Sequence, residues 1–315
     1  MPNLISRIID PWYPATAIGL EKGIASVVHL ERDRGNNYTV RRAATFNVAE
    51  SIIRPSFEDR NIEDPTQLAS VLSDLATSAG LVRQKRWSLS LPEATARTLV
   101  LTMETPTQSG SELQEVLHWK MERGFGAPLE ELSYSRERLG KDNQGRDRYL
   151  AIAIRKDVLA EYEAVMRSLS WRVGLMLPRH LGESQWLKRN GMTGDSLLLS
   201  GSRDGFTAVI LRDRQPLIVR TVTGNEQECE DEFYRLLLFY QDRRSGDDEA
   251  APKTLNRLMV VGTGLTTERV GEIVNEATGG NLQPLDADDL GLLLPGRDLS
   301  FDAIAAPAGL ATLSF

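Results

Sequence analysis

The chain has 315 residues, of which 41% are hydrophobic and 26% charged, so it can bury the core of a soluble globular protein with two lobes or several subdomains. Its net charge of −7 argues against nucleic acid as the main partner, because a phosphate polymer binds to a basic surface. The single cysteine, Cys229, excludes an intramolecular disulfide, and its helical sequence context predicts a buried side chain rather than a nucleophile. No apolar run reaches the roughly 18 residues that would span a bilayer, which favours a cytosolic protein.

The first 92 residues are expected to form strands around one helix. Residues 18–20 and 24–30 are typical of a β-hairpin whose turn is "EKG", and residues 37–48 continue as a third strand. A helix is predicted after them, because Asp64 can cap its first turn and Gly80 can end it. The alternating stretch "RWSLSL" then predicts another strand.

Residues 93–172 are expected to form a compact α+β module. Its first strand, "ARTLVLTM", precedes a helix in which Ser111 and Gln114 have the spacing of a capping box. Two further strands, "LSYSRERLG" and "RYLAIAIRK", are separated by the turn signal "KDNQG". A helix with a regular apolar face at 158–169 closes the module.

The second half of the chain repeats the opening pattern. Three strands with turns at "SRDG" and "RDRQP" lead into a long helix, and an acidic, apolar-poor stretch follows it. The segment "RLMVVGTG" then predicts a buried strand, a glycine turn and a helix that starts near Thr266. This recurrence of a strand-turn-strand unit favours a two-lobed protein with related halves.

Several segments, spread from the first hairpin to the last residue, carry a resemblance to one family. They are "GLEKG", "SLSLPEATARTLVLTMET", "ELQEVLHWKMERGFGAPLEELSYS", "QPLIVRTVTGNEQECEDEFYRLLLFYQ", "VVGTG" and "APAGLATLSF". In these segments the chain resembles the PilM family of type IV pilus assembly proteins. The resemblance implies a mixed α/β, actin-like two-lobed ATPase fold with an inserted α+β subdomain in the first lobe. The expected domains are a first-lobe core at 1–92 completed by 297–315, the inserted subdomain at 93–172 and the second lobe at 173–296.

The resemblance also implies a nucleotide site between the lobes, with ATP or ADP and Mg²⁺ as the cofactor. The two hairpin turns and the "GTG" turn would cradle the nucleotide, since backbone N–H groups in such turns bind phosphate oxygens. The candidate cofactor-binding residues are Gly19, Glu21, Lys22, Gly23, Ser200, Gly201, Gly262, Thr263 and Gly264.

This site departs from the family pattern at both acidic positions. Glu21 stands where the family has an aspartate, and the turn after it is shorter. Ser200 stands at the second aspartate, and a hydroxyl cannot replace a carboxylate as a magnesium ligand. Lys22 could contact a phosphate, but we favour a solvated side chain in a tight turn. Asp204 could assist at the metal, but a role in capping its own turn is favoured.

The "GTG" turn either approaches the nucleotide or is a plain connection between a strand and a helix. Together these departures indicate a degenerate site. We therefore expect weak or absent nucleotide binding, no sustained hydrolysis, no catalytic residue and no metal ligand.

The resemblance implies a cytoplasmic scaffold that lies peripherally at the inner membrane in a type IV pilus assembly machine. Its partner would resemble PilN, whose cytosolic N-terminal peptide would dock in a groove between the first-lobe core and the inserted subdomain, near the helix at 112–123 and the strand after it. Other components of the pilus machine are further expected partners. Whether the protein forms a homo-oligomer is left open by the sequence. Two alternatives are an active Mg-ATP-dependent ATPase, in which Glu21 and Ser200 would work in place of aspartates, and the cytosolic domain of an actin-like type II secretion protein.

Overall fold

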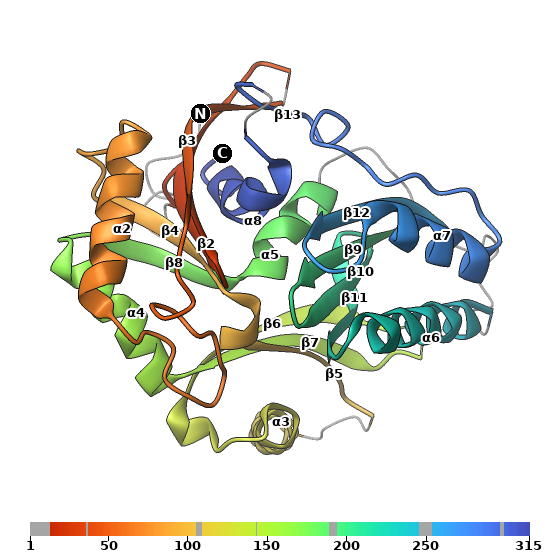
Figure 1. Ribbon diagram of the computed structural model, residues 1–315. Helices are drawn as coiled ribbons and strands as arrows, with labels where there is room; N and C mark the ends of the chain where they lie inside the picture. The colour runs from red at the N-terminus through yellow and green to blue at the C-terminus, as the bar shows by residue number, and fades with distance from the viewer. Residues whose placement is uncertain are drawn as a thin grey trace.

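The structure is a computed structural model that describes residues 13–35, 37–104, 109–142, 144–188, 194–245, 254–296 and 299–315. Within these residues the strands form three sheets of six, four and three strands, which we call the large sheet, the small sheet and the module sheet (Figure 1). Among the described helices none is long and apolar enough to cross a membrane.

The large sheet has the strand order β13-β3-β2-β1-β4-β8. Its strands are β1 (Thr16–Glu21), β2 (Ile24–Arg32), β3 (Tyr38–Asn47), β4 (Arg86–Leu91), β8 (Arg172–Pro178) and β13 (Leu292–Leu293). The predicted opening hairpin is confirmed, since β1 pairs antiparallel with β2 and Gly23 takes the positive φ of 88° that the tight turn needs. β8 pairs in parallel with β4, so the strand at the start of the predicted second lobe lies in the large sheet.

Two helices, α2 (Pro65–Ser78) and α4 (Lys156–Ser168), cover one face of the large sheet. α2 begins and ends where the sequence predicts: the Asp64 side chain accepts a hydrogen bond from the backbone N–H of Gln67, and Gly80 has a φ of 67°. Its leucines at helical spacing, Leu68, Leu72 and Leu75, are fully buried against the sheet.

The other face of the large sheet packs against α8 (Phe301–Thr312), and α5 (Arg179–Glu183) lies beside α8 (Figure 1). The two helices touch backbone to backbone. A Cβ atom at Gly309 would overlap the carbonyl oxygen of Gly182, and one at Gly182 would lie 2.5 Å from the carbonyl oxygen of Ala306. Glycine at both positions therefore permits the crossing.

The small sheet has the order β11-β10-β9-β12 and belongs to the second lobe. Its strands are β9 (Asp195–Ser202), β10 (Gly205–Arg212), β11 (Gln215–Thr223) and β12 (Leu255–Gly262). α6 (Glu226–Ser245) and α7 (Thr267–Thr278) cover its outer face, and Cys229 on α6 is buried as the sequence predicts. The layers therefore follow one another in this order: α2 with α4, the large sheet, α5 with α8, the small sheet, and α6 with α7.

The module sheet consists of β5 (Arg97–Thr102), β7 (Asp147–Arg155) and β6 (Leu132–Lys141), in that order, with α3 (Gly110–Phe125) against one face. The predicted capping role of Ser111 is wrong. Ser109 has extended backbone angles and accepts a hydrogen bond from the backbone N–H of Glu112, so the helix begins earlier. The chain leaves the large sheet after β4 and returns with α4 and β8. The residue bounds of the three domains stay predictions.

Candidate functional site

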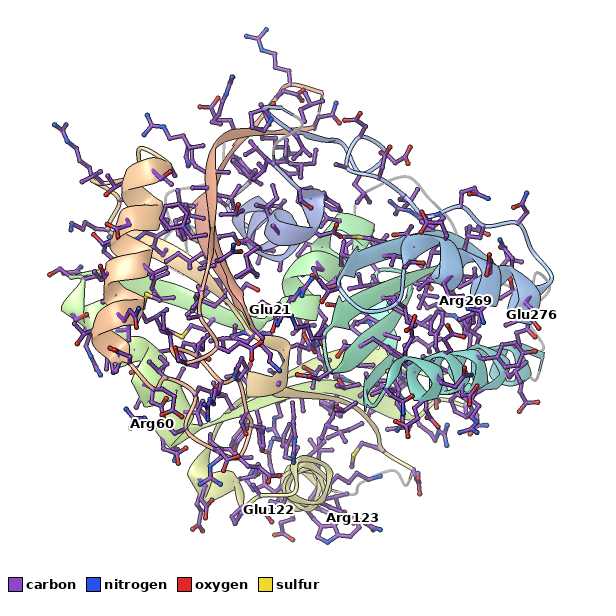
Figure 2. The ribbon with its side chains drawn as sticks, in the orientation of Figure 1. Glu21, Arg60, Glu122, Arg123, Arg269 and Glu276 are labelled. Atoms are coloured by element: carbon purple, nitrogen blue, oxygen red, sulfur yellow. The ribbon has the colours of Figure 1, made fainter. Side chains whose placement is uncertain are left out.

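The structure brings the three turns that carry the predicted site residues to one cleft between the lobes. Glu21 ends β1 and Lys22 follows it, Ser200 and Gly201 lie in β9, and the turn 262–264 begins at the last residue of β12. A cavity of about 550 Å³ opens at this point, and Glu21, Lys22 and Thr263 all line it. Figure 2 shows Glu21 where the two lobes meet.

Packing within the protein accounts for most of the glycines among these residues. A Cβ atom at Gly201 would overlap the carbonyl oxygen of Thr263, and one at Gly262 would overlap that of Gly201, because the turn after β12 lies directly on the β9 backbone. A Cβ atom at Gly19 would lie 2.9 Å from the ring of Pro307 on α8. The glycines are therefore explained without a ligand, and they give no independent indication of one.

Glu21 is held by groups of the protein itself. Its carboxylate accepts hydrogen bonds from the backbone N–H groups of Lys22 at 2.8 Å and Glu93 at 3.1 Å, and Arg179 Nη1 lies 3.7 Å away. Burial raises the pKa of Glu21 above its ordinary value, although the charge of Arg179 and the two backbone N–H groups act in the opposite direction. Glu21, a candidate cofactor-binding residue, thus faces an arginine of the protein itself.

Arg179, at the start of α5, lies beside all three turns. Its Nε donates to Glu183 Oε1 at 2.6 Å, and its Nη1 donates to the carbonyl oxygen of Gly201 at 3.3 Å. A Cβ atom at Gly262 would lie 2.6 Å from Nη2, so the guanidinium also touches the turn after β12. Burial opposes its charge, but Glu183 and Glu21 raise the pKa of Arg179 and keep it protonated.

A buried acid, Glu93, joins the lobes from the short 3-10 helix Glu93–Thr95 after β4. Its Oε1 lies 2.6 Å from Nδ1 of His180 and accepts a hydrogen bond from Thr207 Oγ1 at 2.7 Å. Burial alone would raise the pKa of Glu93, but the charge and hydrogen bonds of His180 and the bond from Thr207 hold it below its ordinary value. Glu93 therefore stays ionised in contact with both lobes.

Two exposed ion pairs cross the rim of the cleft. Lys22 Nζ lies 2.9 Å from Asp204 Oδ2, and Arg203 Nη1 lies 2.6 Å from Glu50 Oε1. The Lys22 side chain is 33% exposed, and because the two hairpin turns face each other it also pairs with Asp204, a contact that the sequence did not predict. The favoured turn-capping role of the Asp204 side chain is not seen, since its carboxylate binds this lysine.

The residues present do not fit a magnesium nucleotide. The Glu21 carboxylate is engaged by an arginine and two N–H groups, and Ser200 Oγ is buried without a hydrogen-bond partner. Two of the three cations that line the cavity, Lys22 and Arg203, are already paired with carboxylates of the protein. In the part of the chain that the structure describes, no group of three His, Cys, Asp or Glu side chains could hold a metal ion.

Sequence reasoning missed Glu93, Arg179, His180 and Thr207. Their contacts join residues 87 and 114 positions apart, and no local motif marks such pairs. One sequence feature pointed to Arg179 and His180. The charged run "RHLGE" directly follows the apolar stretch "LMLP", and Pro178 stands just before the first helical residue.

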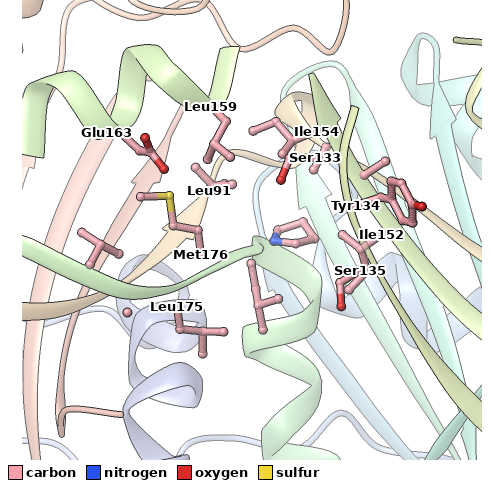
Figure 3. Close-up of a pocket in the computed structure, with 16 residues that line it drawn as sticks. Leu91, Ser133, Tyr134, Ser135, Ile152, Ile154, Leu159, Glu163, Leu175 and Met176 are labelled. Atoms are coloured by element: carbon pink, nitrogen blue, oxygen red, sulfur yellow. The ribbon is translucent and has the colours of Figure 1, made fainter. Parts of the chain in front are cut away.

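A second hollow, of about 250 Å³, lies between the module sheet and the large sheet (Figure 3). Ser133, Tyr134 and Ser135 of β6 line one side, and Leu175 and Met176 of β8 line the other. β6 and β8 are the last strands in the orders of their sheets, so this groove runs between two sheet edges. The strand after α3 thus borders the groove, whereas α3 contributes none of its lining residues.

No protein-family model matches the chain, and no curated protein matches it. Among solved structures it is similar to a chain of the PilM-PilN type IV pilus biogenesis complex, with 16% sequence identity, a TM-score of 0.73 and coverage of 96% of this chain and 99% of that one. A Bacteroides thetaiotaomicron protein with an actin-like ATPase fold and unknown function matches with 13% identity, a TM-score of 0.48 and coverage of 98% and 99%. The cytoplasmic domain of EpsL, an inner-membrane component of the Vibrio cholerae type II secretion system, matches with 11% identity, a TM-score of 0.46 and 95% coverage of both chains. The actin-like two-lobed fold predicted from the sequence is confirmed.

Proposed function

We propose that this protein is an actin-like scaffold of a type IV pilus assembly machine. It docks the cytosolic N-terminal peptide of a PilN-like inner-membrane protein and thereby lies at the cytoplasmic side of that membrane. The likeness to a chain of a PilM-PilN complex, over nearly the full length of both chains, supports this assignment.

The groove between β6 and β8 is the observation that carries the proposal. An extended peptide can add to a sheet edge through main-chain hydrogen bonds while its side chains enter adjacent pockets. The groove offers two such edges and an apolar floor that includes Leu91, Ile152 and Leu159 (Figure 3). Glu163 is the acidic side chain beside this floor and favours a basic residue in the peptide.

The cleft between the lobes supports a role without hydrolysis. Arg179 and two backbone N–H groups take up the carboxylate of Glu21, and Ser200 supplies no charge for a magnesium ion. The proposal therefore assigns weak or absent nucleotide binding to this cleft and protein binding to the groove.

Gly174 of β8 allows a direct test by steric blocking. It lines the groove and is exposed, and a Cβ atom there would meet nothing within 4 Å, so a large side chain can enter the groove without straining the fold. We expect Gly174→Trp to weaken binding of a labelled synthetic peptide, taken from the cytosolic N-terminus of the PilN-like protein of the same genome, at least about tenfold (about 1.4 kcal/mol). Fluorescence anisotropy measures the affinity.

Two controls accompany this titration. Gly174→Ala adds one methyl group at the same place and should bind nearly as the unaltered protein does. Gly110→Trp places the same indole at an exposed glycine of α3, where a Cβ atom also meets open space, and should leave binding unchanged. The proposal fails if the unaltered protein does not bind the peptide, or if Gly174→Trp and Gly110→Trp bind it equally well.

A further inference from the structure

Buried side chains connect the two lobes directly across the cleft. Glu93, in the short 3-10 helix that follows β4 of the large sheet, accepts a hydrogen bond from Thr207 in β10 of the small sheet. Glu93 is 8% exposed and Thr207 is fully buried. Water therefore does not compete for this bond, and separating the lobes would leave an ionised carboxylate without its donor.

Arg179 makes a second connection of the same kind. On one side its guanidinium faces Glu21 of β1, and on the other it donates to the carbonyl oxygen of Gly201 in β9. The planar guanidinium carries several N–H donors in fixed directions, so a single side chain can serve both lobes at once. Glu183 binds the same guanidinium at 2.6 Å and fixes its orientation.

Further contacts join the lobes on either side of these residues. Asp302 at the start of α8 accepts a hydrogen bond from the backbone N–H of Gly262 in the second lobe. Arg148 of the module sheet donates to the carbonyl oxygens of Pro216 and Leu217 on β11. The second lobe is therefore held both by α8 and by the module.

The exposed pairs at the rim contribute less to this closure. The side chains of Arg203 and Glu50 are 60% and 56% exposed, and that of Asp204 is 62% exposed. Pairs of this kind gain little in water and are screened by salt. The contacts that can hold the lobes together are therefore the buried ones.

We propose that Glu21, Glu93, Arg179 and Thr207 form a permanent lock that keeps the two lobes closed without any ligand. The lock occupies the place at which the turns of both lobes meet, and it supplies from the protein the cation and the hydrogen bonds that a bound ligand would bring. This goes beyond the proposed scaffold role: the protein presents its groove in one fixed arrangement and does not open and close with a nucleotide cycle.

The distance between the lobes tests the lock. Spin labels at Asp74→Cys on α2 and Glu276→Cys on α7, both exposed, report this distance by pulsed electron paramagnetic resonance in a Cys229→Ala background. We expect one narrow distance distribution without ligand and the same distribution with millimolar Mg-ATP. A broad distribution that narrows only when Mg-ATP is added would overturn the proposal.

Variants locate the lock within the cleft. Arg179→Lys keeps the charge but loses the rigid fork, and Thr207→Val removes the donor to Glu93. Each should broaden the distribution toward longer distances. Arg41→Lys is the matched control, because Arg41 pairs with Glu31 inside the large sheet, and it should change nothing. If both folded lock variants kept the narrow distribution of the unaltered protein, these residues would not be the lock.

Measurement at high salt distinguishes closure by the buried lock from closure by the exposed rim pairs, because salt weakens only the exposed pairs strongly. At about 1 M salt the Debye length is about 3 Å, so exposed pairs are largely screened. We expect the narrow distribution to persist there. Opening of the unaltered protein at high salt would assign the closure to the rim and contradict the proposal.

Discussion

Glu93 is buried in the cleft and the Glu21 side chain is 15% exposed there, and their surroundings shift the pKa values of the two carboxyl groups in opposite directions. Burial raises the pKa of Glu21, and Arg179 at 3.7 Å is too far to offset it fully. Glu93 also loses water, but its direct contacts with His180 and Thr207 lower its pKa. At Glu93 the charge of His180 and the hydrogen bonds from His180 and Thr207 outweigh the loss of water, whereas at Glu21 the charge of Arg179 and two backbone N–H groups do not.

This difference predicts opposite pH dependences for two variants. The ordinary pKa of both groups is 4.5. For Glu93, whose folded pKa is lower, the stabilisation relative to Glu93→Gln is complete above 4.5 and is lost as the pH falls through the folded pKa. For Glu21, whose folded pKa is higher, the stability relative to Glu21→Gln is greatest below 4.5 and declines as the pH rises through the folded pKa.

Urea unfolding of the three proteins between about pH 3.5 and about pH 7 measures these differences in the free energy of unfolding. The matched substitutions serve as controls for each other, since each removes one carboxylate from the same cleft. For each variant the difference in the free energy of unfolding from the unaltered protein is followed with pH. If this difference changed in the same direction for both variants, the assigned surroundings of the two acids would be contradicted.

Residues with local signals were predictable, and residues defined by distant partners were not. Glu21 stands out because it lies in a hairpin turn, and the structure does place it in the cleft. Arg179 and His180 have no comparable signal, since their roles depend on contacts with the first hairpin, β9 and the turn after β4. The pairing of Lys22 with Asp204 was not predicted for the same reason, because Asp204 lies in the other lobe.

At the scale of elements, the crossing of α5 and α8 fixes how the lobes join. The crossing brings Gly182 and Gly309 into backbone contact, and Trp186 Nε1 adds a hydrogen bond at 2.8 Å to the carbonyl oxygen of Ala305. Apolar residues of α8 pack between the two sheets. Any side chain inserted at the crossing must therefore move a helix.

We expect Gly309→Ala to lower the free energy of unfolding by about 1–3 kcal/mol, the range for overpacking a tight interior. The added methyl group would meet the backbone of Gly182 rather than a flexible side chain, so the strain cannot be relieved locally. Gly110→Ala adds the same methyl group to an exposed helix start with open space around it, and it should leave the stability nearly unchanged. Equal stabilities of the two variants in urea would show that the helices do not cross this closely.

Elements with clear start and stop signals were predicted well. α2 has Asp64 before it and Gly80 after it, and its leucines recur at helical spacing. β8 was not assigned as a strand, because it is a short apolar stretch without alternation, and such stretches do not distinguish a strand from a buried helix. The N-cap of α3 was predicted wrongly. Ser109 and Ser111 are both possible capping residues in the sequence, and only the backbone angles decide between them.

For the whole molecule, the order of layers separates two possible binding places. The cleft lies between the large and small sheets and is crossed by the protein's own side chains. The groove lies between the edges of the large sheet and the module sheet. The fold was predictable because the resemblance extends over the chain, although the identity to the pilus protein is 16%. The groove was expected only in outline, since which strand edges border it depends on the pairing of β8.

If the fold holds a protein partner rather than a nucleotide, the peptide should stabilise the protein against unfolding and Mg-ATP should not. A ligand present at 100 times its dissociation constant raises the free energy of unfolding by about 2.7 kcal/mol if it binds only the folded state. We predict that the PilN-like peptide, at 100 times the dissociation constant from the anisotropy titration, gives a gain of this size, and that millimolar Mg-ATP gives none. A gain in stability with Mg-ATP and none with the peptide would contradict the proposed scaffold function.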